Sequence, residues 1–300
     1  MPFPPLPTRA AYIHLSNPPR RNALSLSILR SLRSQLHQQL TSPTSGRLLT
    51  LPPFDPSIIS DLQAGNPKYK WLLDAEVWRK ERKGLPNIIV LRSEGPVFSS
   101  GHDLKELRTL SHAEVKETFA LCAEVMTLIR RSPAIVIGCI QGLATAAGAQ
   151  LALTTDITIA KKSAKFQLPG ASIGLPCTSP STAVSRRLSS GHAFRMLALA
   201  ESMTAEGMNG AVDIAIPEAG ESEEEAFERR IARVVTQVAE ETAGQPSALG
   251  KWAFWTQLGI KCYEDAVAWA GQVMALHAEG EDAGRGIEAF LEKKKPEWAT

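Results

Sequence analysis

The chain has 300 residues, of which 44% are hydrophobic and 21% charged, and its formal net charge is +2. This balance excludes a surface that attracts nucleic acid or anionic membrane by overall charge, and no run reaches the roughly 20 apolar residues of a membrane span. The four cysteines show no CxxC spacing, so we expect reduced thiols, no disulfide framework and no metal site.

The N-terminal segment is rich in arginine. Residues 1–54 contain six arginines and no aspartate, glutamate or lysine, which is typical of a mitochondrial transit peptide. Folded structure is the alternative, because residues 11–15 alternate as a strand does and residues 24–40 show helical spacing. The early strand favours the folded interpretation. The arginine-rich composition predicts a mitochondrial protein, with cytoplasmic localisation as the alternative.

Residues 41–85 interrupt the regular pattern. Four prolines come first, and a charged stretch at 68–83 follows with Trp71 and Trp78 in it. Such an excursion between a helix and a strand is typical of an insertion with some helix of its own. A lid, a subunit contact and surface decoration are the three interpretations.

Strands and helices alternate after the insertion. Residues 87–91, 134–140 and 156–160 are almost wholly apolar, as strands are when both faces of their sheet are covered. Ser111 begins a helix, with Glu114 placed to complete a capping box. Another helix opens at about residue 146, and beyond residue 180 we expect mainly helix, including 221–241 and 282–294. The pattern predicts a layered α/β fold.

Two loops share one design. Residues 97–107 and 141–151 each read as a strand, a turn of small residues and a helix start. Such turns leave backbone N–H groups free, and two of them aimed at one point form an oxyanion hole for a negatively charged carbonyl oxygen. Neither the second loop nor residues 163–178 contain a carboxylate.

These loops, with Asn22-Ala23-Leu24-Ser25 before them and residues 290–296 after them, resemble the enoyl-CoA hydratase/isomerase (crotonase) family. The resemblance covers residues 10–40 and 86–300. It implies an α/β crotonase (ClpP-like) spiral of ββα units within residues 1–200, interrupted at 41–85. It also implies a helical region at 201–300 that forms trimers, often paired into hexamers. The ligand would be a coenzyme A thioester, with no tightly bound cofactor and no nucleic-acid or membrane partner.

The resemblance also assigns site residues. His102 and Ala147 would supply the two backbone N–H groups of an oxyanion hole. Phe290 and Lys293 would reach coenzyme A bound to a neighbouring subunit. The remaining residues assigned to acyl-CoA contact are Arg20, Arg21, Asn22, Ala23, His102, Asp103, Leu104 and Lys105.

Two positions depart from the family pattern. The glutamates that activate water in hydratases of this family fall at Gln150 and Gly170. Glutamine hydrogen-bonds a water but does not accept its proton near neutral pH, and glycine has no side chain. Ordinary hydration is therefore not expected, whereas the oxyanion hole would still stabilise an enolate or a tetrahedral oxyanion.

Several other side chains near the two loops are candidates for proton transfer, nucleophilic attack or binding of a water. We expect Asp103 to cap a helix. The imidazole of His102 is a candidate proton carrier, and Cys177 is either a nucleophile or, more simply, a packed wall residue. The candidates for holding a water are Thr145, Ser172 and Thr178.

Three functions follow from the sequence. The first is an enzyme acting on acyl-CoA in fatty acyl-CoA metabolism, with hydratase, isomerase and thioester hydrolase chemistry all open. The second is a non-catalytic acyl-CoA binder or regulator that lost its acids. The third is RNA binding, which one branch of the family shows. The net charge of +2 and the absence of a Lys/Arg-rich helix argue against it.

Overall fold

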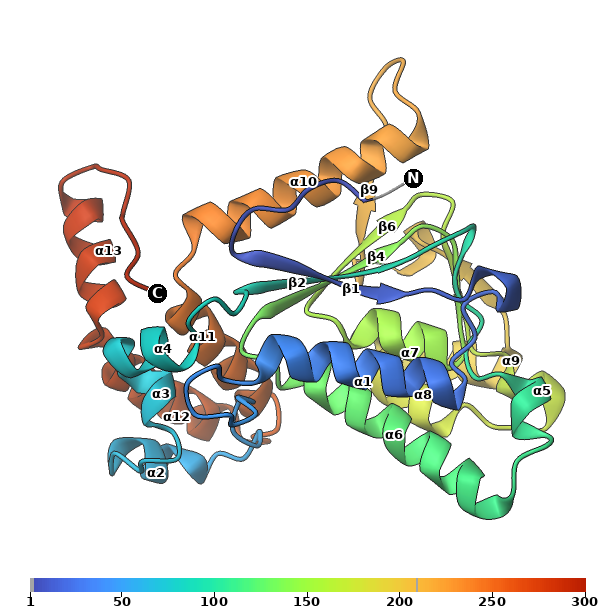
Figure 1. Cartoon of the computed structure of the whole chain (residues 1–300), viewed down its shortest axis with the longest axis horizontal. Helices are drawn as coiled ribbons and strands as arrows, with labels where there is room; N and C mark the ends of the chain where they lie inside the picture. The colour runs from blue at the N-terminus through green and yellow to red at the C-terminus, as the bar shows by residue number, and fades with distance from the viewer. Residues whose placement is uncertain (1–2, 209) are drawn as a thin grey trace.

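The computed structural model describes residues 3–208 and 210–300 (Figure 1). The protein consists of two β-sheets and the helices packed on them. The first sheet is parallel, in the order β1-β2-β4-β6-β9, and the second has the order β3-β5-β7-β8, with β8 antiparallel to β7. The strands are β1 (Ala10–Leu15), β2 (Ile88–Ser93), β3 (Val97–Ser99), β4 (Ile135–Ile140), β5 (Leu143–Thr145), β6 (Ile157–Lys161), β7 (Lys165–Gln167), β8 (Ser202–Thr204) and β9 (Asp213–Ala215).

The helices cover both faces of the first sheet, with α10 on one face and α1, α6 and α7 on the other (Figure 1). The α-helices are α1 (Leu26–Leu40), α2 (Ile58–Gln63), α3 (Lys70–Leu73), α4 (Ala75–Glu81), α5 (Leu104–Leu107), α6 (His112–Arg130), α7 (Ala147–Thr154), α8 (Thr178–Val184), α9 (Ser190–Leu199), α10 (Glu223–Glu241), α11 (Gly244–Gln257), α12 (Tyr263–Ala278) and α13 (Glu281–Leu291). Three short 3-10 helices are η1 (Pro18–Arg20), η2 (Pro169–Ile173) and η3 (Glu206–Met208).

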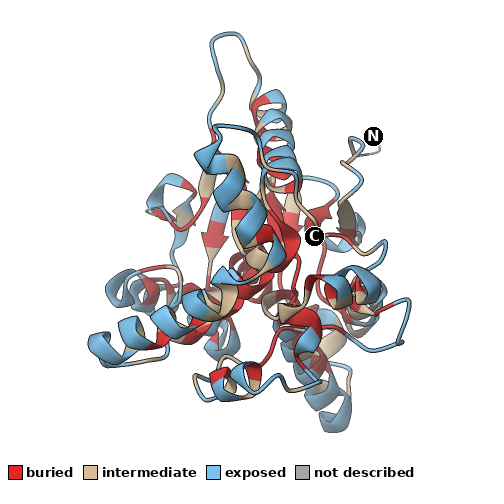
Figure 2. Ribbon diagram, turned by 90° about the vertical axis from the view of Figure 1, so that its left-hand side faces the viewer, coloured by how far each residue is buried: buried red, intermediate tan, exposed pale blue. Residues whose placement is uncertain are grey.

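The apolar strands are buried on both faces, as the sequence predicts. All six residues of β2 are buried. Ile88 and Val90 pack with α10, whereas Ile89 and Leu91 pack with α1 and α6. Figure 2 shows these buried strands at the centre, with the exposed surfaces of the helices outside them. A parallel sheet with two covered faces needs such continuous apolar runs.

A repeating unit connects the two sheets. β2 continues into β3, β4 into β5 and β6 into β7, and each pair is followed by helix. The second strand of each pair enters the second sheet, where β3, β5 and β7 lie side by side and run parallel. This arrangement confirms the predicted crotonase spiral of ββα units. It also brings the carboxyl ends of three strands to one edge.

The sheets continue past residue 200. β8 pairs with β7 and β9 pairs with β6, so both sheets are completed within the part of the chain expected to be helical. Each of these strands has only three residues, too few to show an alternation in the sequence. The helical region begins at α10, where Ser222 and Glu225 form a capping box.

The insertion at 41–85 packs against the C-terminal helices. Trp71 and Trp78 stack with ring centroids 5.6 Å apart, and they share an apolar cluster with Trp252 of α11 and Trp269 of α12. The indole of Trp252 donates to the carbonyl of Pro53 at 3.0 Å. The indole of Trp269 donates in the same way to the carbonyl of Pro56 at 2.9 Å. The insertion thus builds a second core with α11 and α12.

The arginine-rich N-terminal segment is folded. β1 pairs with β2 along its whole length, and α1 buries Leu29, Leu32 and Leu36 against the sheet. The folded interpretation of residues 11–40 is therefore confirmed. Within the described ranges, every helix is too short or too polar to cross a membrane.

Candidate functional site

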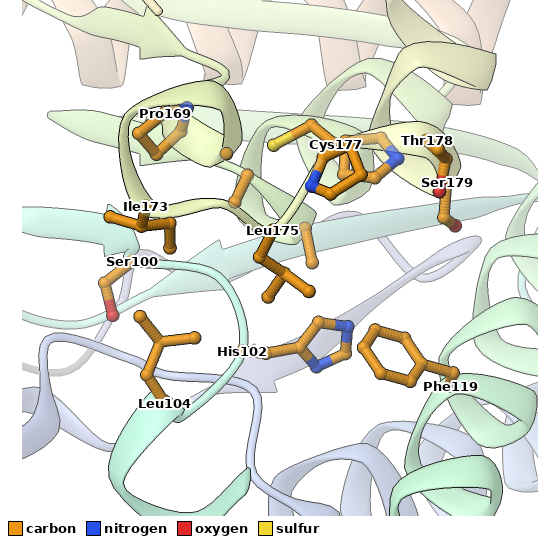
Figure 3. Close-up of a pocket in the computed structure, with 15 residues that line it drawn as sticks. Ser100, His102, Leu104, Phe119, Pro169, Ile173, Leu175, Cys177, Thr178 and Ser179 are labelled. Carbon is orange, nitrogen blue, oxygen red and sulfur yellow. The ribbon is translucent and has the colours of Figure 1, made fainter. Parts of the chain in front are cut away.

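A cavity of about 340 Å³ lies where β3, β5 and β7 end (Figure 3). Its lining comes from the loop after β3, the start of α7 and the segment from η2 to α8. Apolar side chains dominate it, among them Phe119, Ile173 and Leu175. Phe119, on α6, is 38% exposed and borders the cavity.

Two glycines let the two loops touch. Gly101 has φ +79°, and a Cβ there would lie 2.9 Å from Cβ of Ala146 and 3.2 Å from the backbone nitrogen of Ala147. Gly148 lies against the carbonyl of Ser99, which a Cβ would approach to 2.4 Å. Real side chains do not tolerate such contacts, so these positions need glycine for close packing of the backbone.

The start of α7 is strained as well as tightly packed. Ala146 precedes the helix at φ 51° and ψ −122°, outside the ordinary regions for a residue with a Cβ. This conformation turns the chain sharply from β5 into α7. Ala146 donates to the carbonyl of Gln167 at 2.9 Å and accepts from the N–H of Gln150 at 3.1 Å. Such strain often occurs at functional sites, where the surrounding structure holds it in place.

The backbone N–H groups of His102 and Ala147 lie beside the cavity. His102 and Ala147 both line it. Among the residues that the structure describes, no acceptor takes a hydrogen bond from the N–H of either residue. The neighbouring Asp103 is occupied: its carboxylate accepts from the N–H of Lys105 at 3.0 Å and of Glu106 at 3.1 Å, as expected of a helix cap.

The imidazole of His102 has a defined orientation. Its Nδ1 lies 3.3 Å from the carbonyl oxygen of Leu24, and its ring meets that of Phe119 edge to face with centroids 4.8 Å apart. A carbonyl oxygen only accepts hydrogen bonds, so Nδ1 carries the proton and Nε2 presents a lone pair. Burial lowers the pKa of His102 below 6.5, and the ring is therefore neutral at pH 7.

Gln150, at the first glutamate position, is tied to a neighbour. Its side chain is buried, and its amide pairs with the hydroxyl of Ser179, with Nε2 and Oε1 lying 3.0 Å and 3.2 Å from Oγ. Ser179 borders the cavity, whereas Gln150 is not among the lining residues. The Gln150 amide thus holds Ser179, a residue of the cavity wall, without bordering the cavity itself.

Gly170, at the second glutamate position, has no room for a side chain. A Cβ there would lie 2.1 Å from the carbonyl oxygen of Leu175 and 2.8 Å from Sγ of Cys177. The loop after η2 therefore fills the place where a larger residue would stand. Glycine here is a packing requirement of this chain.

Of the other candidate side chains, some border the cavity and others do not. Cys177 borders the cavity, and burial raises the pKa of its thiol, so the sulfur stays protonated at neutral pH. This agrees with a wall residue. Thr178 also lines the cavity, Ser172 does not, and Thr145 has a buried hydroxyl without a hydrogen-bond partner in the described chain.

The segment from Arg20 to Ala23 borders the first loop. Arg20 is half-exposed and pairs with Asp103 at 3.4 Å, and Arg21 is exposed. Asn22 is fully buried: its Nδ2 donates to the carbonyls of Glu94 and Val97, both at 2.7 Å.

Asn22 also accepts at Oδ1 from the N–H of Asn17 at 2.7 Å, and Ala23 beside it is buried. The Asn22 side chain therefore holds the loop in place, a role that the sequence did not reveal.

The remaining predicted contacts lie in two places. Leu104 lines the cavity, and Lys105 is exposed beside it on α5. Phe290 is 81% exposed on α13, with Lys293 just beyond that helix. Figure 1 shows α13 and α5 at opposite sides of the molecule, so a single chain does not bring these two groups together.

Within residues 3–208 and 210–300, no cluster of histidine, cysteine, aspartate and glutamate side chains could hold a metal ion. The carboxylate nearest in sequence to the unpartnered N–H groups, that of Asp103, is engaged in the cap of α5. The cavity therefore combines apolar walls, the backbone N–H groups of His102 and Ala147, one imidazole and the hydroxyls of Ser100, Thr178 and Ser179.

Comparison with known proteins identifies the family. The family model for enoyl-CoA hydratase/isomerase matches residues 80–300. Mouse enoyl-CoA hydratase domain-containing protein 3 is 35% identical over 293 residues, which cover 96% of this chain and 80% of the relative. The crystal structure of the human protein of that name is 32% identical, covers 97% of each chain and gives a TM-score of 0.73.

A crystal structure of an enoyl-CoA hydratase from Mycobacterium smegmatis is 30% identical, with a TM-score of 0.73 and coverage of 98% of this chain and 96% of that one. The vertebrate relatives from mouse, rat, human and zebrafish are named as mitochondrial proteins, and they confirm the predicted mitochondrial assignment over the cytoplasmic alternative. The fold, the loop sequences and these relatives agree: the chain belongs to the enoyl-CoA hydratase/isomerase family.

Proposed function

We propose that this protein binds an acyl-CoA thioester with its carbonyl oxygen between the backbone N–H groups of His102 and Ala147, and stabilises an enolate there in fatty acyl-CoA metabolism. One observation carries the proposal: the N–H groups of His102 and Ala147 come from two different loops, lack an acceptor among the described residues and belong to residues that border one apolar cavity. Buried N–H groups without acceptors are rare in proteins. A developing negative charge on oxygen would satisfy both at once.

The shape and polarity of the cavity suit the acyl part of such a ligand. Phe119, Ile173 and Leu175 offer apolar contact to a chain. Arg20, Arg21 and Lys105 lie near the first loop as positive charges for the phosphates of coenzyme A. The thioester serves as substrate or ligand, and the proposal requires no tightly bound cofactor.

We also propose that the protein assembles as a homotrimer or a dimer of trimers. Met274 on α12 and Phe290 and Leu291 on α13 are each more than 70% exposed. Exposed apolar side chains gathered on neighbouring helices are typical of contact surfaces. In such an assembly, Phe290 and Lys293 would reach coenzyme A bound by another subunit.

A non-catalytic acyl-CoA binder is the second candidate. Its support is the state of the two glutamate positions, where Gln150 is bound to Ser179 and Gly170 is enclosed by backbone. A protein with this site would hold the thioester without adding water to it. The two candidates share the ligand and differ only in turnover.

Two substitutions test the role of the N–H groups. Ala147→Pro removes one N–H at the first position of α7, where proline is accepted in helices. Ala147→Gly retains the N–H and is the matched control. We expect the proline variant to lose about 10²–10³-fold in formation of the acetoacetyl-CoA enolate, followed by its ultraviolet absorbance.

The control should stay within about threefold of the parent protein in that assay, because glycine keeps the same N–H donor. Binding of butyryl-CoA and of free coenzyme A, measured by calorimetry, tests the ligand that both candidates share. Enolate formation or turnover supports the enzyme, and tight thioester binding without either supports the binder. If the thioester bound no better than coenzyme A, the proposed function would be wrong.

A further inference from the structure

We propose that Nε2 of the His102 imidazole accepts and returns the proton of the carbon next to the thioester carbonyl, the task for which this cavity holds no carboxylate. The inference rests on the proposed function, because it requires a thioester in the cavity. It assigns His102 two parts: its backbone N–H binds the oxygen, and its side chain moves the proton.

The orientation of the ring supports this assignment. Leu24 donates its N–H to the carbonyl of Gly101 at 2.7 Å and offers its own carbonyl to Nδ1 of His102. The backbone just before His102 and the imidazole ring itself are therefore held by the same neighbour. Phe119 packs edge-on against the imidazole. Together these contacts fix the tautomer with the lone pair on Nε2.

Access to the cavity is the second support. Nε2 of His102 has no hydrogen-bond partner in the described chain, yet it is not among the fully buried polar atoms that lack one. Nε2 of His37, by contrast, is such a buried atom. The lone pair of His102 is therefore accessible, and the residue itself lines the cavity. Figure 3 shows the ring beneath Leu175, with one nitrogen on the side of the Cys177–Ser179 wall.

Among the described residues, no charged side chain makes a hydrogen bond or an ion pair with this imidazole. The carboxylate of Asp103 faces the helix cap and Arg20, and that of Glu106 accepts from the N–H of Leu26 at 3.1 Å. Across the cavity stands the thiol of Cys177, whose pKa burial raises. Burial alone lowers the pKa of His102, against a smaller opposing effect of the Leu24 carbonyl. The ring thus stays a neutral base at pH 7.

The proposed step conserves atoms and electrons. The C–H bond at carbon 2 breaks, its proton goes to Nε2, and its electron pair forms the carbon–carbon double bond of an enolate. The negative charge on the thioester oxygen is held by the N–H groups of His102 and Ala147. The imidazolium keeps its Nδ1–H bond to Leu24. If the imidazolium exchanges its Nε2 proton with water before it returns a proton to carbon 2, solvent hydrogen enters the thioester. With a 3-enoyl chain the enolate is a dienolate, and return of the proton to carbon 4 gives the 2-enoyl isomer.

Hydrogen exchange tests the proposal without a known substrate. Butyryl-CoA is incubated with the full-length protein in D₂O, and deuterium at carbon 2 is followed by NMR. His102→Gln keeps the backbone N–H and removes the base, so we expect at least about 100-fold slower exchange. Affinity for butyryl-CoA should remain within about threefold. His112→Gln, on an exposed histidine at the start of α6, is the control and should exchange normally.

The pH dependence of the exchange rate in the parent protein gives a second test, which requires no substitution. Exchange should rise as pH rises through a value below 6.5 and then stay level, because the base must be neutral. A rate that keeps rising towards pH 9 would point to the Cys177 thiol and overturn the proposal.

Normal exchange in His102→Gln would overturn it too, and so would butyryl-CoA binding without any exchange in the parent protein. That last result leaves the proposed thioester binding intact, whereas failure to bind the thioester refutes the proposed function itself.

Discussion

The backbone part and the side-chain part of this site have different structural support. His102 and Ala147 offer N–H groups whose positions depend on close contacts made by Gly101 and Gly148. At the two glutamate positions, Gln150 is bound to Ser179 and Gly170 is closed by Leu175. A backbone donor survives most changes of its own side chain, whereas a side-chain acid is lost with one substitution. A member of this fold can therefore keep the class of ligand it binds while the reaction it performs changes.

The largest effect that tests this comparison comes from Gly170→Glu. The new Cβ would stand 2.1 Å from the carbonyl oxygen of Leu175, so the loop after η2 must move. We expect the free energy of unfolding to fall by about 3 kcal/mol or more. Chemical denaturation measures it. Gly191→Glu is the control, because a Cβ there meets nothing within 4 Å. Equal stability of the two variants would contradict the closed site.

Asn22→Ala tests the support of the first loop. The change removes three hydrogen bonds, one from the N–H of Asn17 and two to the carbonyls of Glu94 and Val97. We expect a loss of about 2–3 kcal/mol in the free energy of unfolding, together with weaker butyryl-CoA binding. In the control Asn17→Ala, the side chain lost makes no hydrogen bond in the described structure. Equal effects of the two changes would contradict the assigned role.

Ser179→Ala tests whether Gln150 serves the wall. The variant leaves a buried amide without its partner, and we expect a loss of about 1 kcal/mol in the free energy of unfolding. The double variant with Gln150→Met should recover much of it, since both polar groups are then absent. A double-mutant cycle by denaturation measures the coupling. Strict additivity would show that the two side chains do not interact.

The smallest effect is expected for Gln150→Glu. A glutamate there supplies one of the two missing acids, but Gly170 still supplies none. We expect hydration of crotonyl-CoA, followed by loss of its conjugated absorbance, to stay at the level of the parent protein. A gain of tenfold or more would show that one acid suffices, and the contrast between the two parts of the site would be weaker than stated.

Much of the fold follows from local sequence patterns. The apolar run of β2 and the capping box of Ser111 and Glu114 each predict an element that the structure contains. The short strands β8 and β9 escape prediction, since three residues carry no pattern. The packing of the insertion could not be predicted for another reason. Trp71 and Trp78 are far in sequence from Trp252 and Trp269, and they meet only after folding.

The site divides in a similar way. The glycines of the two loops and the cap formed by Asp103 are local features, and the sequence predicts them. The hydrogen bonds of the Asn22 side chain reach backbone carbonyls more than 70 residues away along the chain, so no local sequence pattern reveals them. The closure over Gly170 likewise depends on how the next loop folds back. Long-range contacts thus account for what the sequence leaves out.

A crystal structure with bound acetoacetyl-CoA tests the central claim most directly. The account predicts the thioester oxygen within about 2.7–3.1 Å of the backbone nitrogens of both His102 and Ala147. The acyl chain should lie against Phe119 and Leu175, with Gly170 still enclosed. A thioester oxygen bound elsewhere, with these two N–H groups left without an acceptor, would contradict the account.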